Sequence, residues 1–462
     1  MSYEEFYAKI EEVAQQLKHQ ETPFHIITHL DTDGLTSASI LIKALKREEK
    51  TFAVSVVKQI TEQLLTRLSR EPCSTIVFLD LGSGNLQQIA SFLKNKTIII
   101  LDHHQIQESS FSCHQINPLQ YDLNPYEISG AGITYIFAKA MNKKNKDSAY
   151  LAILGAIGDR QENKGFIGLN SEILKEATNI EVKTGLRMFG TQTRSLHKVL
   201  EYSYDPYIPG ITGNETNAVH FLEEIGIPIK DNGKFRKLVH LSQEETKKLI
   251  TSIILRRLGS EKSPEDILGN IYLLKDEEEE LPTKDLKEFS TLLNCCGRLN
   301  KPALGIGTCL NDQAAKQKAI ELLISYKREI IQALNWFYAN RKTEAVIEED
   351  NFVILNAEEN IKDTLIGTIC SIIVSSGVYK EGTMLLGMAH TLDDNAKISM
   401  RVVGKKEVNL KETLGEITKK IKCESGGHNF AAGALIPQEK EQEFLETAVS
   451  VLKKRAIEEV IG

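Results

Sequence analysis

Leu101-Asp102-His103-His104 begins with the last residue of the apolar segment 97–101. That segment predicts a short buried strand. Three earlier apolar segments alternate with stretches of helical periodicity: residues 24–30, 51–57 and 76–79. Short buried strands that alternate with helices are typical of a mostly parallel sheet with helices on both faces. The sequence therefore predicts a doubly wound α/β domain, which we expect to span residues 1–205.

Acidic and imidazole side chains lie where these strands are expected to end. In a parallel sheet the carboxyl ends of the strands meet at one edge, and ligands bind there. Alternate positions of an extended chain point to the same side, so the side chains of the first loop are expected to gather. One further carboxylate follows the apolar helical stretch 152–158. The candidate residues are His29, Asp31, Asp33, Asp80, Asp102, His103, His104 and Asp159.

Carboxylates this close together repel one another unless they share protons or bind a cation. Imidazole and carboxylate ligands together suit manganese, iron or zinc better than calcium, which prefers oxygen ligands alone. Taken singly, Asp31 or Asp33 also fits an ordinary helix N-cap, and paired histidines also fit a hydrogen-bonded structural feature. Because unrelated caps have no reason to collect at successive strand ends, the whole pattern favours a two-metal centre.

These segments resemble the motifs of the DHH phosphoesterase superfamily. Four motifs match in order: Thr28-His29-Leu30-Asp31-Thr32-Asp33-Gly34, Phe78-Leu79-Asp80-Leu81-Gly82, Leu101-Asp102-His103-His104 and Gly155-Ala156-Ile157-Gly158-Asp159. Residues 129–134 and 292–299 resemble RecJ-type members, the latter through their Asn-Ala-Ala-Gly-Arg motif. Residues 399–401 and 425–433 resemble the DHH-associated domain. The length and motif spacing are most similar to archaeal RecJ-like nucleases, including the GINS-associated nuclease type.

The resemblance implies a role for each residue of the metal centre. One divalent ion is expected to be held by His29, Asp31 and Asp80, and the other by Asp33, Asp80, His103 and Asp159. Asp102 is expected to accept a hydrogen bond from an imidazole and His104 to face the scissile phosphate, which makes both catalytic. Two manganese ions are favoured, with magnesium as the alternative.

The resemblance also implies substrate-binding residues in the later part of the chain. The expected set is Asn294, Arg298, Ser399, Arg401, Gly426, Gly427 and His428. Arginine suits this task because its planar guanidinium pairs with a phosphate through two hydrogen bonds. Gly426-Gly427 fits either a tight turn or a close approach of backbone amides to a phosphate, and the family context with His428 favours the latter.

Three further parts are expected after residue 205. Residues 206–310 predict a mostly helical middle insert that ends in the Asn-Cys-Cys-Gly-Arg motif. Residues 311–340 carry apolar periodicity without Pro or Gly, which predicts a long connecting helix. Residues 341–462 mix strands and helices and are expected to form a smaller α/β DHH-associated domain. Within the insert, residues 211–285 fit equally a partner-docking element and a packing domain.

The formal net charge of −7 excludes broad electrostatic coating of a nucleic acid, so binding is expected to use a local basic groove. Three groups of residues are candidates, and each fits a solvated surface equally well. The acidic run 276–280 is expected to be a solvated loop. The basic groups are Arg187, Arg194, His197 and Lys198; Arg298 and Lys301; and Lys397, Arg401, Lys405 and Lys406.

The sequence predicts no membrane partner. No segment approaches the roughly 18 apolar residues of a membrane span, and residues 1–6 lack the features of a signal peptide. The seven cysteines form no CxxC pair, which is typical of reduced thiols and predicts no zinc site. We therefore expect a cytoplasmic protein.

Together these features predict a metal-dependent, single-strand-specific exonuclease. It is expected to hydrolyse phosphodiester bonds of DNA, RNA or both to nucleoside 5′-monophosphates. The resemblance implies a role in DNA replication and repair, in contact with the GINS complex and through it with the replicative helicase. Two alternatives stay open: a replisome scaffold with a weak or silent nuclease site, and a phosphodiesterase for short oligonucleotides or cyclic dinucleotides.

Overall fold

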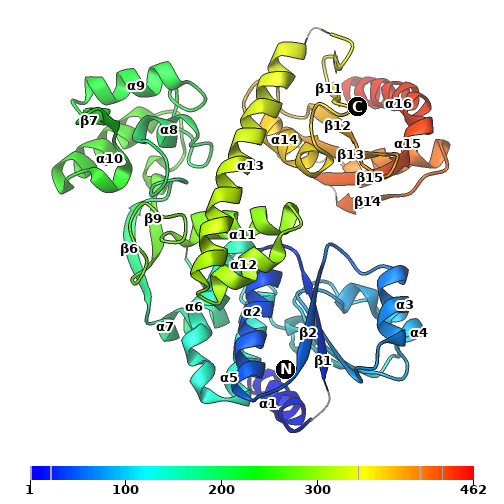
Figure 1. The fold of residues 1–462 in the computed structure, drawn as a ribbon. Helices are drawn as coiled ribbons and strands as arrows, with labels where there is room; N and C mark the ends of the chain where they lie inside the picture. The colour runs from blue at the N-terminus through cyan, green and yellow to red at the C-terminus, as the bar shows by residue number, and fades with distance from the viewer. Residues whose placement is uncertain are drawn as a thin grey trace. The chain divides into compact units, whose positions relative to one another are not determined.

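A computed structural model describes residues 3–20, 23–163, 165–341, 343–404, 408–428 and 430–461. The chain forms two compact units, Met1–Leu323 and Ile324–Gly462. Figure 1 labels their helices and strands. The first unit contains the residues expected at the metal centre, and the second contains those expected in the DHH-associated domain.

The first unit is built on a five-stranded sheet with the order β2-β1-β3-β4-β5, in which all neighbouring strands are parallel. Strands β1, β3 and β4 consist almost entirely of buried residues, as continuous apolar sequences in a covered sheet require. The strands are β1 (Phe24–His29), β2 (Phe52–Val57), β3 (Thr75–Leu79), β4 (Thr97–Leu101) and β5 (His114–Ile116).

Helices cover both faces of this sheet (Figure 1). On one face α2 (Thr32–Arg47), α5 (Gly130–Met141) and α6 (Ala149–Gly158) pack against one another, and α1 (Tyr3–His19) packs on α5. The other face is covered by α3 (Glu62–Arg70) and α4 (Leu86–Phe92), which share a hydrophobic core with Phe78 and Ile100 of the sheet. The predicted doubly wound α/β architecture is confirmed.

The parallel register brings the ends of three strands together. Thr28 of β1 pairs with Leu79 of β3, and Leu79 pairs with Leu101 of β4. The backbone N–H of Asp80 continues this pairing by donating to the carbonyl oxygen of Leu101 at 2.9 Å. The residues that follow β1, β3 and β4 therefore share one edge of the sheet.

A separate hydrophobic core follows in the chain, and we call residues 186–268 that form it the middle domain. Its base is the antiparallel pair β6 (Ile180–Leu186) and β9 (Leu268–Leu274). This core includes Leu186 at the end of β6 as well as Leu196 and Leu200, all of which precede the boundary expected at residue 205. Its elements are α8 (Leu196–Glu201), α9 (Glu215–Glu224), β7 (Lys230–Asp231), β8 (Lys234–Phe235) and α10 (Gln243–Arg257).

Three helices come after the middle domain. Helix α11 (Leu286–Arg298) packs against α12 (Pro302–Cys309), and both contact α2, while α11 also contacts α6. Helix α13 (Gln313–Asn340) matches the connecting helix expected over residues 311–340, and the boundary between the two units falls within it. The Asn-Cys-Cys-Gly-Arg motif on α11 thus lies against the helices of the sheet domain.

The second unit is a six-stranded mixed sheet with the order β10-β11-β12-β13-β15-β14. Helix α14 (Asp363–Ser375) contacts β12 and β13. The strand side chains that alternate with those facing α14, such as Leu386 and Met400, share a core with α15 (Leu410–Lys420) and α16 (Glu441–Ile461). The strands are β10 (Val346–Glu348), β11 (Phe352–Asn356), β12 (Met384–His390), β13 (Asn395–Val402), β14 (Ser425–His428) and β15 (Ala431–Pro437).

All seven cysteines are free thiols, and five of them are buried. None of the helices in the described ranges combines the length and the apolar character that a membrane span requires.

The buried carboxyl of Asp285 gives the fold a testable pH dependence. Asp285 caps α11 by accepting a hydrogen bond from the backbone N–H of Lys287 at 2.8 Å. Burial and the nearby Glu288 carboxylate raise the pKa of Asp285 to about 7. In the unfolded chain the pKa of an aspartate is near 4. Between about pH 4 and pH 7, Asp285 therefore takes up a proton when the chain folds. The free energy of unfolding therefore falls as the pH rises from about 4 to about 7.

We expect Asp285→Asn to keep the cap and to lose this pH dependence. In urea denaturation the variant should be more stable than the unaltered protein at about pH 8, by on the order of 1–4 kcal/mol, and close to it at about pH 4. Asp276→Asn, at an exposed position of the acidic run, is the control and should change neither value. An equal difference at both pH values would contradict the prediction.

Candidate metal centre

The loop after β1 places a carboxylate next to His29. Asp31 is the N-cap of α2, and its Oδ1 accepts a hydrogen bond from the backbone N–H of Gly34 at 3.0 Å. Its other oxygen, Oδ2, lies 2.8 Å from Nδ1 of His29. Burial alone would lower the pKa of His29, but the carboxylates of Asp31 and Asp80 raise it to about 11. Asp31 is therefore both a helix cap and a member of the cluster.

Asp33 is fully buried in the first turn of α2 and reaches the start of α5. Its two carboxylate oxygens accept hydrogen bonds from the backbone N–H groups of Gly130 at 2.7 Å and Ala131 at 2.9 Å. N–H groups at a helix N-terminus stabilise a negative charge. Even so, burial and the carboxylates of Asp80 and Asp159 raise the pKa of Asp33 well above its usual value. The centre therefore holds more negative charge than its surroundings stabilise.

Asp80 lies at the middle of the cluster. It follows β3 with a φ of 57°, a left-handed conformation that is costly for a residue with a side chain and is often found at functional sites. Its carboxylate lies 3.4 Å from Nδ1 of His29, 3.5 Å from Nε2 of His103 and 3.8 Å from Nδ1 of His104. Burial alone would raise the pKa of Asp80, but His103 and His29 lower it. Three imidazoles thus face one buried carboxylate.

His103 joins Asp80 to the end of α6. Its Nε2 lies 3.0 Å from Oδ2 of Asp159, the C-cap residue of α6, and 3.8 Å from Oδ2 of Asp33. Its Nδ1 lies 3.3 Å from the carbonyl oxygen of Pro125. Burial alone would lower the pKa of His103, but Asp159 and Asp80 raise it well above its usual value. The carbonyl of Pro125 orients the imidazole so that Nε2 faces the carboxylates.

Asp102 is buried behind the cluster and orients His104. Its Oδ1 accepts hydrogen bonds from Nδ1 of His104 at 2.7 Å and from the backbone N–H of His103 at 2.8 Å, and its Oδ2 accepts from the N–H of Ser83 at 2.9 Å. Burial alone would raise the pKa of Asp102, but the bond to His104 lowers it. The same bond raises the pKa of His104, whose side chain is 57% exposed. Asp102 thus fixes the orientation of an accessible imidazole by a hydrogen bond to one of its ring nitrogens.

The donor atoms fit two cations. His29, Asp31 and Asp80 offer atoms that all lie within 4.8 Å of one another, and so does the group Asp33, Asp80, His103 and Asp159. Among the described residues, Nδ1 of His29, Nε2 of His103 and both carboxylate oxygens of Asp80 are buried and make no well-aligned hydrogen bond, although oppositely charged groups lie within 4 Å of them. Buried polar atoms left this way are costly, and coordination of a cation would satisfy them. Asp80 belongs to both groups, and also to an overlapping one with His103 and His104.

Helix α11 lies against the loop after β1. The side-chain oxygen Oδ1 of Asn294 accepts a hydrogen bond from the backbone N–H of Thr32 at 3.0 Å. The hydroxyl of Thr32 donates to the carbonyl oxygen of Ser290 at 2.8 Å. Sequence reasoning missed both contacts and assigned Asn294 to the substrate, because no local pattern marks a contact between residues this far apart in the chain. Arg298, at the end of the same helix, is exposed.

In the second unit, Ser399 and Arg401 lie on the face of β13 that contacts α14. Nε of Arg401 donates to the hydroxyl of Ser371 at 3.1 Å, and Nη1 donates to the carbonyl oxygen of Met400 at 2.8 Å. Gly426 and Gly427 belong to β14, and Gly427 has a φ of 138°, which favours glycine. The side chain of His428 and residues Lys405 and Lys406 lie outside the described part of the chain.

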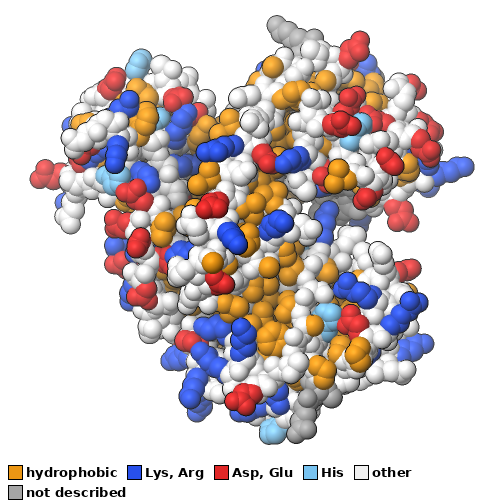
Figure 2. Space-filling view, viewed as in Figure 1, with side chains coloured by type: hydrophobic (Ala, Val, Ile, Leu, Met, Phe, Trp, Pro, Cys, Tyr) orange, Lys and Arg blue, Asp and Glu red, His pale blue; other side chains and the backbone are white. Residues whose placement is uncertain are grey.

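The basic residues expected around 187–198 are matched by nearby acidic groups. Arg187 lies 2.9 Å from Asp205, and Lys198 lies 2.7 Å from Glu215. Arg194 is half-buried and its guanidinium lies over the rings of Phe189 and Tyr202. On the face shown in Figure 2, acidic and basic side chains of the middle domain are interspersed. These residues therefore form no continuous basic groove.

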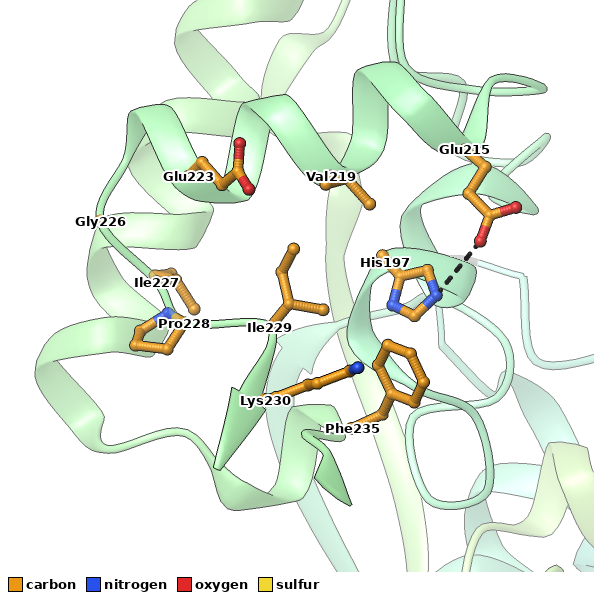
Figure 3. A pocket seen from close by; sticks show the side chains of 10 residues that line it. All are labelled: His197, Glu215, Val219, Glu223, Gly226, Ile227, Pro228, Ile229, Lys230 and Phe235. Carbon is orange, nitrogen blue, oxygen red and sulfur yellow. Dashed lines mark ion pairs between the residues drawn. The ribbon is translucent and has the colours of Figure 1, made fainter. Parts of the chain in front are cut away.

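The middle domain contains a pocket of about 700 Å³ (Figure 3). Phe235 is 51% exposed there and packs against His197, with the ring centres 5.0 Å apart and the ring planes tilted by 47°. Apolar side chains of Val219 and Ile229 face the same space, and Nζ of Lys230 lies 4.6 Å from the centre of the Phe235 ring. The pocket is mainly apolar and has charged residues at its margin.

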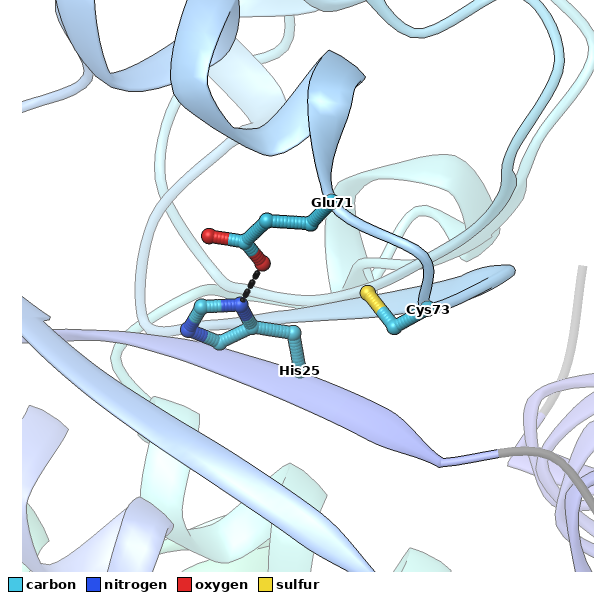
Figure 4. A group of neighbouring side chains, drawn as sticks. All are labelled: His25, Glu71 and Cys73. Carbon is cyan, nitrogen blue, oxygen red and sulfur yellow. Dashed lines mark hydrogen bonds and ion pairs between the residues drawn. The ribbon is translucent and has the colours of Figure 1, made fainter.

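A separate group of donor atoms lies at the other end of β1, where His25, Glu71 and Cys73 come together (Figure 4). Nδ1 of His25 is hydrogen-bonded to Glu71, and its Nε2 lies 2.9 Å from the hydroxyl of Ser55. The ammonium of Lys96 donates to the carbonyl oxygens of Glu71 and Cys73. Both imidazole nitrogens of His25 have hydrogen-bond partners, and the ammonium group of Lys96 already supplies a positive charge. We therefore interpret this group as a hydrogen-bonded structural feature at the end of the sheet.

Comparisons with known proteins match this architecture along the chain. The DHH family N-terminal domain matches residues 23–158, the DHH-CID domain residues 188–269 and the DHHA1 domain residues 350–454. An uncharacterized protein of Methanocaldococcus jannaschii is 30% identical over 478 aligned residues, which cover 98% of each chain.

Two solved structures share the fold over nearly the whole chain. The crystal structure of exonuclease RecJ bound to manganese has a TM-score of 0.60 and 15% identity, covering 96% of this chain and 93% of that one. CDC45 from Entamoeba histolytica has a TM-score of 0.68 and 12% identity, covering 97% of this chain and 99% of that one. The chain therefore belongs to the DHH superfamily of phosphoesterases and has the RecJ-like arrangement of DHH and DHHA1 domains.

Proposed function

We propose that this protein is a metal-dependent, single-strand-specific exonuclease that hydrolyses phosphodiester bonds of DNA, RNA or both to nucleoside 5′-monophosphates. One observation carries the proposal: buried Asp80 is shared by two groups of ligand atoms, each of which fits a cation. Two cations held close together by a shared carboxylate are typical of enzymes that cleave phosphodiesters. Intact ligand groups favour an enzyme over a scaffold with a silent site.

Two divalent cations are proposed, with manganese favoured and magnesium as the alternative. RecJ structures with bound manganese or magnesium support this choice. When bound, the cations supply a water of lowered pKa and stabilise negative charge on the phosphate oxygens. The proposed ligands are His29, Asp31 and Asp80 for one cation, and Asp33, Asp80, His103 and Asp159 for the other.

His104 and Asp102 are proposed to act on the scissile phosphate. The hydrogen bond from Nδ1 of His104 to Asp102 leaves Nε2 on the side of the ring that points away from Asp102. The hydrogen bond to Asp102 raises the pKa of His104, so the carboxylate stabilises the imidazolium form of the ring. That ring donates a hydrogen bond from Nε2 to a phosphate oxygen and thereby offsets the charge that grows as the bond breaks.

Substrate binding is proposed for residues of both units. Arg298 is exposed at the end of α11, where its guanidinium suits a phosphate of the nucleic acid. In the second unit, Ser399 and Arg401 share one face of β13 and are proposed to bind the chain end together with Gly426, Gly427 and His428. Asn294 was part of this expected set, and its contact with Thr32 supports a different role.

A role at the replication fork is proposed alongside the nuclease activity, through contact with the GINS complex and through it with the replicative helicase. The DHH-CID match over residues 188–269 and the shared fold with CDC45 support it. The pocket of the middle domain is the proposed contact surface, because Phe235 and Ile229 offer apolar area that the rest of the domain leaves uncovered. A scaffold in which this contact is the main function is the second candidate.

Asp80→Asn should abolish hydrolysis while it preserves the fold, because asparagine tolerates the left-handed φ but supplies a weaker shared ligand. A loss of about 4 kcal/mol of transition-state stabilisation corresponds to about a thousandfold in rate. The assay is digestion of end-labelled single-stranded DNA and RNA of matched sequence with added manganese. Asp122→Asn is the control, since Asp122 also has a positive φ, 56°, on the surface. Full activity of Asp80→Asn would overturn the shared-ligand assignment.

The same assay separates a nuclease from the alternatives. Stepwise release of mononucleotides by the unaltered protein alone would support the proposal. Cleavage of dinucleotides without cleavage of either polymer would indicate a short-oligonucleotide phosphodiesterase. No hydrolysis of any of these substrates would leave the scaffold role.

Arg298→Ala should weaken substrate binding more than it slows chemistry. A charge-assisted hydrogen bond to phosphate contributes roughly 1.5–3 kcal/mol, so KM is expected to rise about tenfold or more while kcat changes little. Steady-state kinetics with a single-stranded oligonucleotide measure both constants. Lys318→Ala, an exposed cation on α13, is the control. A fall in kcat with unchanged KM would contradict a binding role.

Phe235→Glu should weaken the association with GINS about tenfold or more, because it places a charge in the apolar pocket. Calorimetric titration of the full chain with the GINS complex measures this. Leu255→Glu is the control, since Leu255 is 61% exposed in the same domain but does not line the pocket. Equal binding by both variants would show that GINS docks elsewhere, and nuclease activity should be unchanged in each.

A further inference from the structure

Helix α11 fixes the loop that carries the first metal ligands. Oδ1 of Asn294 accepts a hydrogen bond from the backbone N–H of Thr32 at 3.0 Å. The hydroxyl of Thr32 donates to the carbonyl oxygen of Ser290 at 2.8 Å and lies 3.1 Å from the Ser290 hydroxyl. Thr32 stands between Asp31 and Asp33, which belong to different ligand groups. These three contacts with α11 thus hold the residue that separates the two groups.

The backbone N–H of Thr32 needs an acceptor from outside its own helix. Thr32 is the first residue of α2, and the first N–H groups of a helix have no partner within it. The cap residue Asp31 accepts from Gly34 instead. Because Thr32 is fully buried, a missing acceptor would leave an unsatisfied N–H, which costs roughly 1–3 kcal/mol. Asn294 supplies that acceptor.

The backbone of α11 approaches the loop so closely that the contact has little freedom. An added Cβ at Gly297 would overlap the carbonyl oxygen of Leu30, the residue before Asp31. A bulkier residue there would push the helix away and lengthen the bond from Asn294 to Thr32. Gly297 and Asn294 therefore act together: Gly297 lets the helix come close to the loop, and Asn294 supplies the hydrogen-bond acceptor.

We propose that Asn294 is a positioning residue of the metal centre, which fixes the backbone of Thr32 and with it the relative placement of Asp31 and Asp33. Residues behind metal ligands that orient them typically change metal affinity by about 10–100-fold when they are lost. This inference rests on the proposed metal centre, but it gives Asn294 a role in ligand geometry in place of a role in binding the nucleic acid.

The test compares Asn294→Leu, which removes the acceptor at similar volume, with Asn294→Asp, which keeps an oxygen at the same position. Manganese binding to the full chain is measured by calorimetry without substrate. Asn294→Leu should bind manganese about tenfold more weakly or worse, and Asn294→Asp should bind no more weakly than the unaltered protein. Thr291→Val is the control on α11, since the Thr291 hydroxyl donates within its own helix, to the carbonyl oxygen of Lys287.

Kinetics at saturating manganese separate this role from substrate contact. We expect near-normal KM for both Asn294 variants, with the activity of Asn294→Leu partly restored by excess manganese. Unchanged manganese affinity of Asn294→Leu, or a raised KM in Asn294→Asp from repulsion of phosphate, would overturn the inference. Absence of manganese binding by the unaltered protein would overturn the proposed metal centre itself, an outcome that the variants are not needed to detect.

Discussion

The crowding of carboxylates at one edge of a parallel sheet is the constraint on which the first unit depends. Asp33 and Asp80 are almost completely buried, and Asp159 lies close enough to raise the pKa of Asp33. Within the described part of the chain, imidazoles and backbone N–H groups offset this charge. A fold that kept such a cluster for stability alone would be more stable with apolar residues of the same size. The arrangement is therefore a cost to folding that cation binding offsets.

The surrounding backbone is shaped to admit these carboxylates. Asp33 points at the N-terminus of α5, and helix α6 passes beside it only because residue 155 is glycine, whose added Cβ would overlap Oδ1 of Asp33. Asp80 adopts a left-handed φ that turns its side chain out of the strand direction and toward the imidazoles. The packing of α5 and α6 and the strained backbone of Asp80 thus both position the carboxylates of Asp33 and Asp80. The stability of the sheet domain therefore depends on the geometry of this edge.

The features that local sequence patterns encode could be predicted from the sequence. The alternation of apolar runs and helical periodicity predicted the doubly wound sheet, and the spacing of His29, Asp31 and Asp33 predicted that they gather at its edge. The middle domain was placed less well, because the pairing of β6 with β9 joins segments about 90 residues apart and leaves no periodic signal. The contact of Asn294 with Thr32 was missed for the same reason, since an asparagine inside a helix does not reveal its partner.

Helix α11 explains why a motif so late in the chain bears on the metal centre. Near its start, the carboxylate of Glu288 accepts a hydrogen bond from the backbone N–H of Gln192 at 2.8 Å and one from the hydroxyl of Thr193, at the base of the middle domain. Two turns later, Asn294 holds Thr32. The same helix therefore makes hydrogen bonds both to the middle domain and to the loop that bears Asp31 and Asp33.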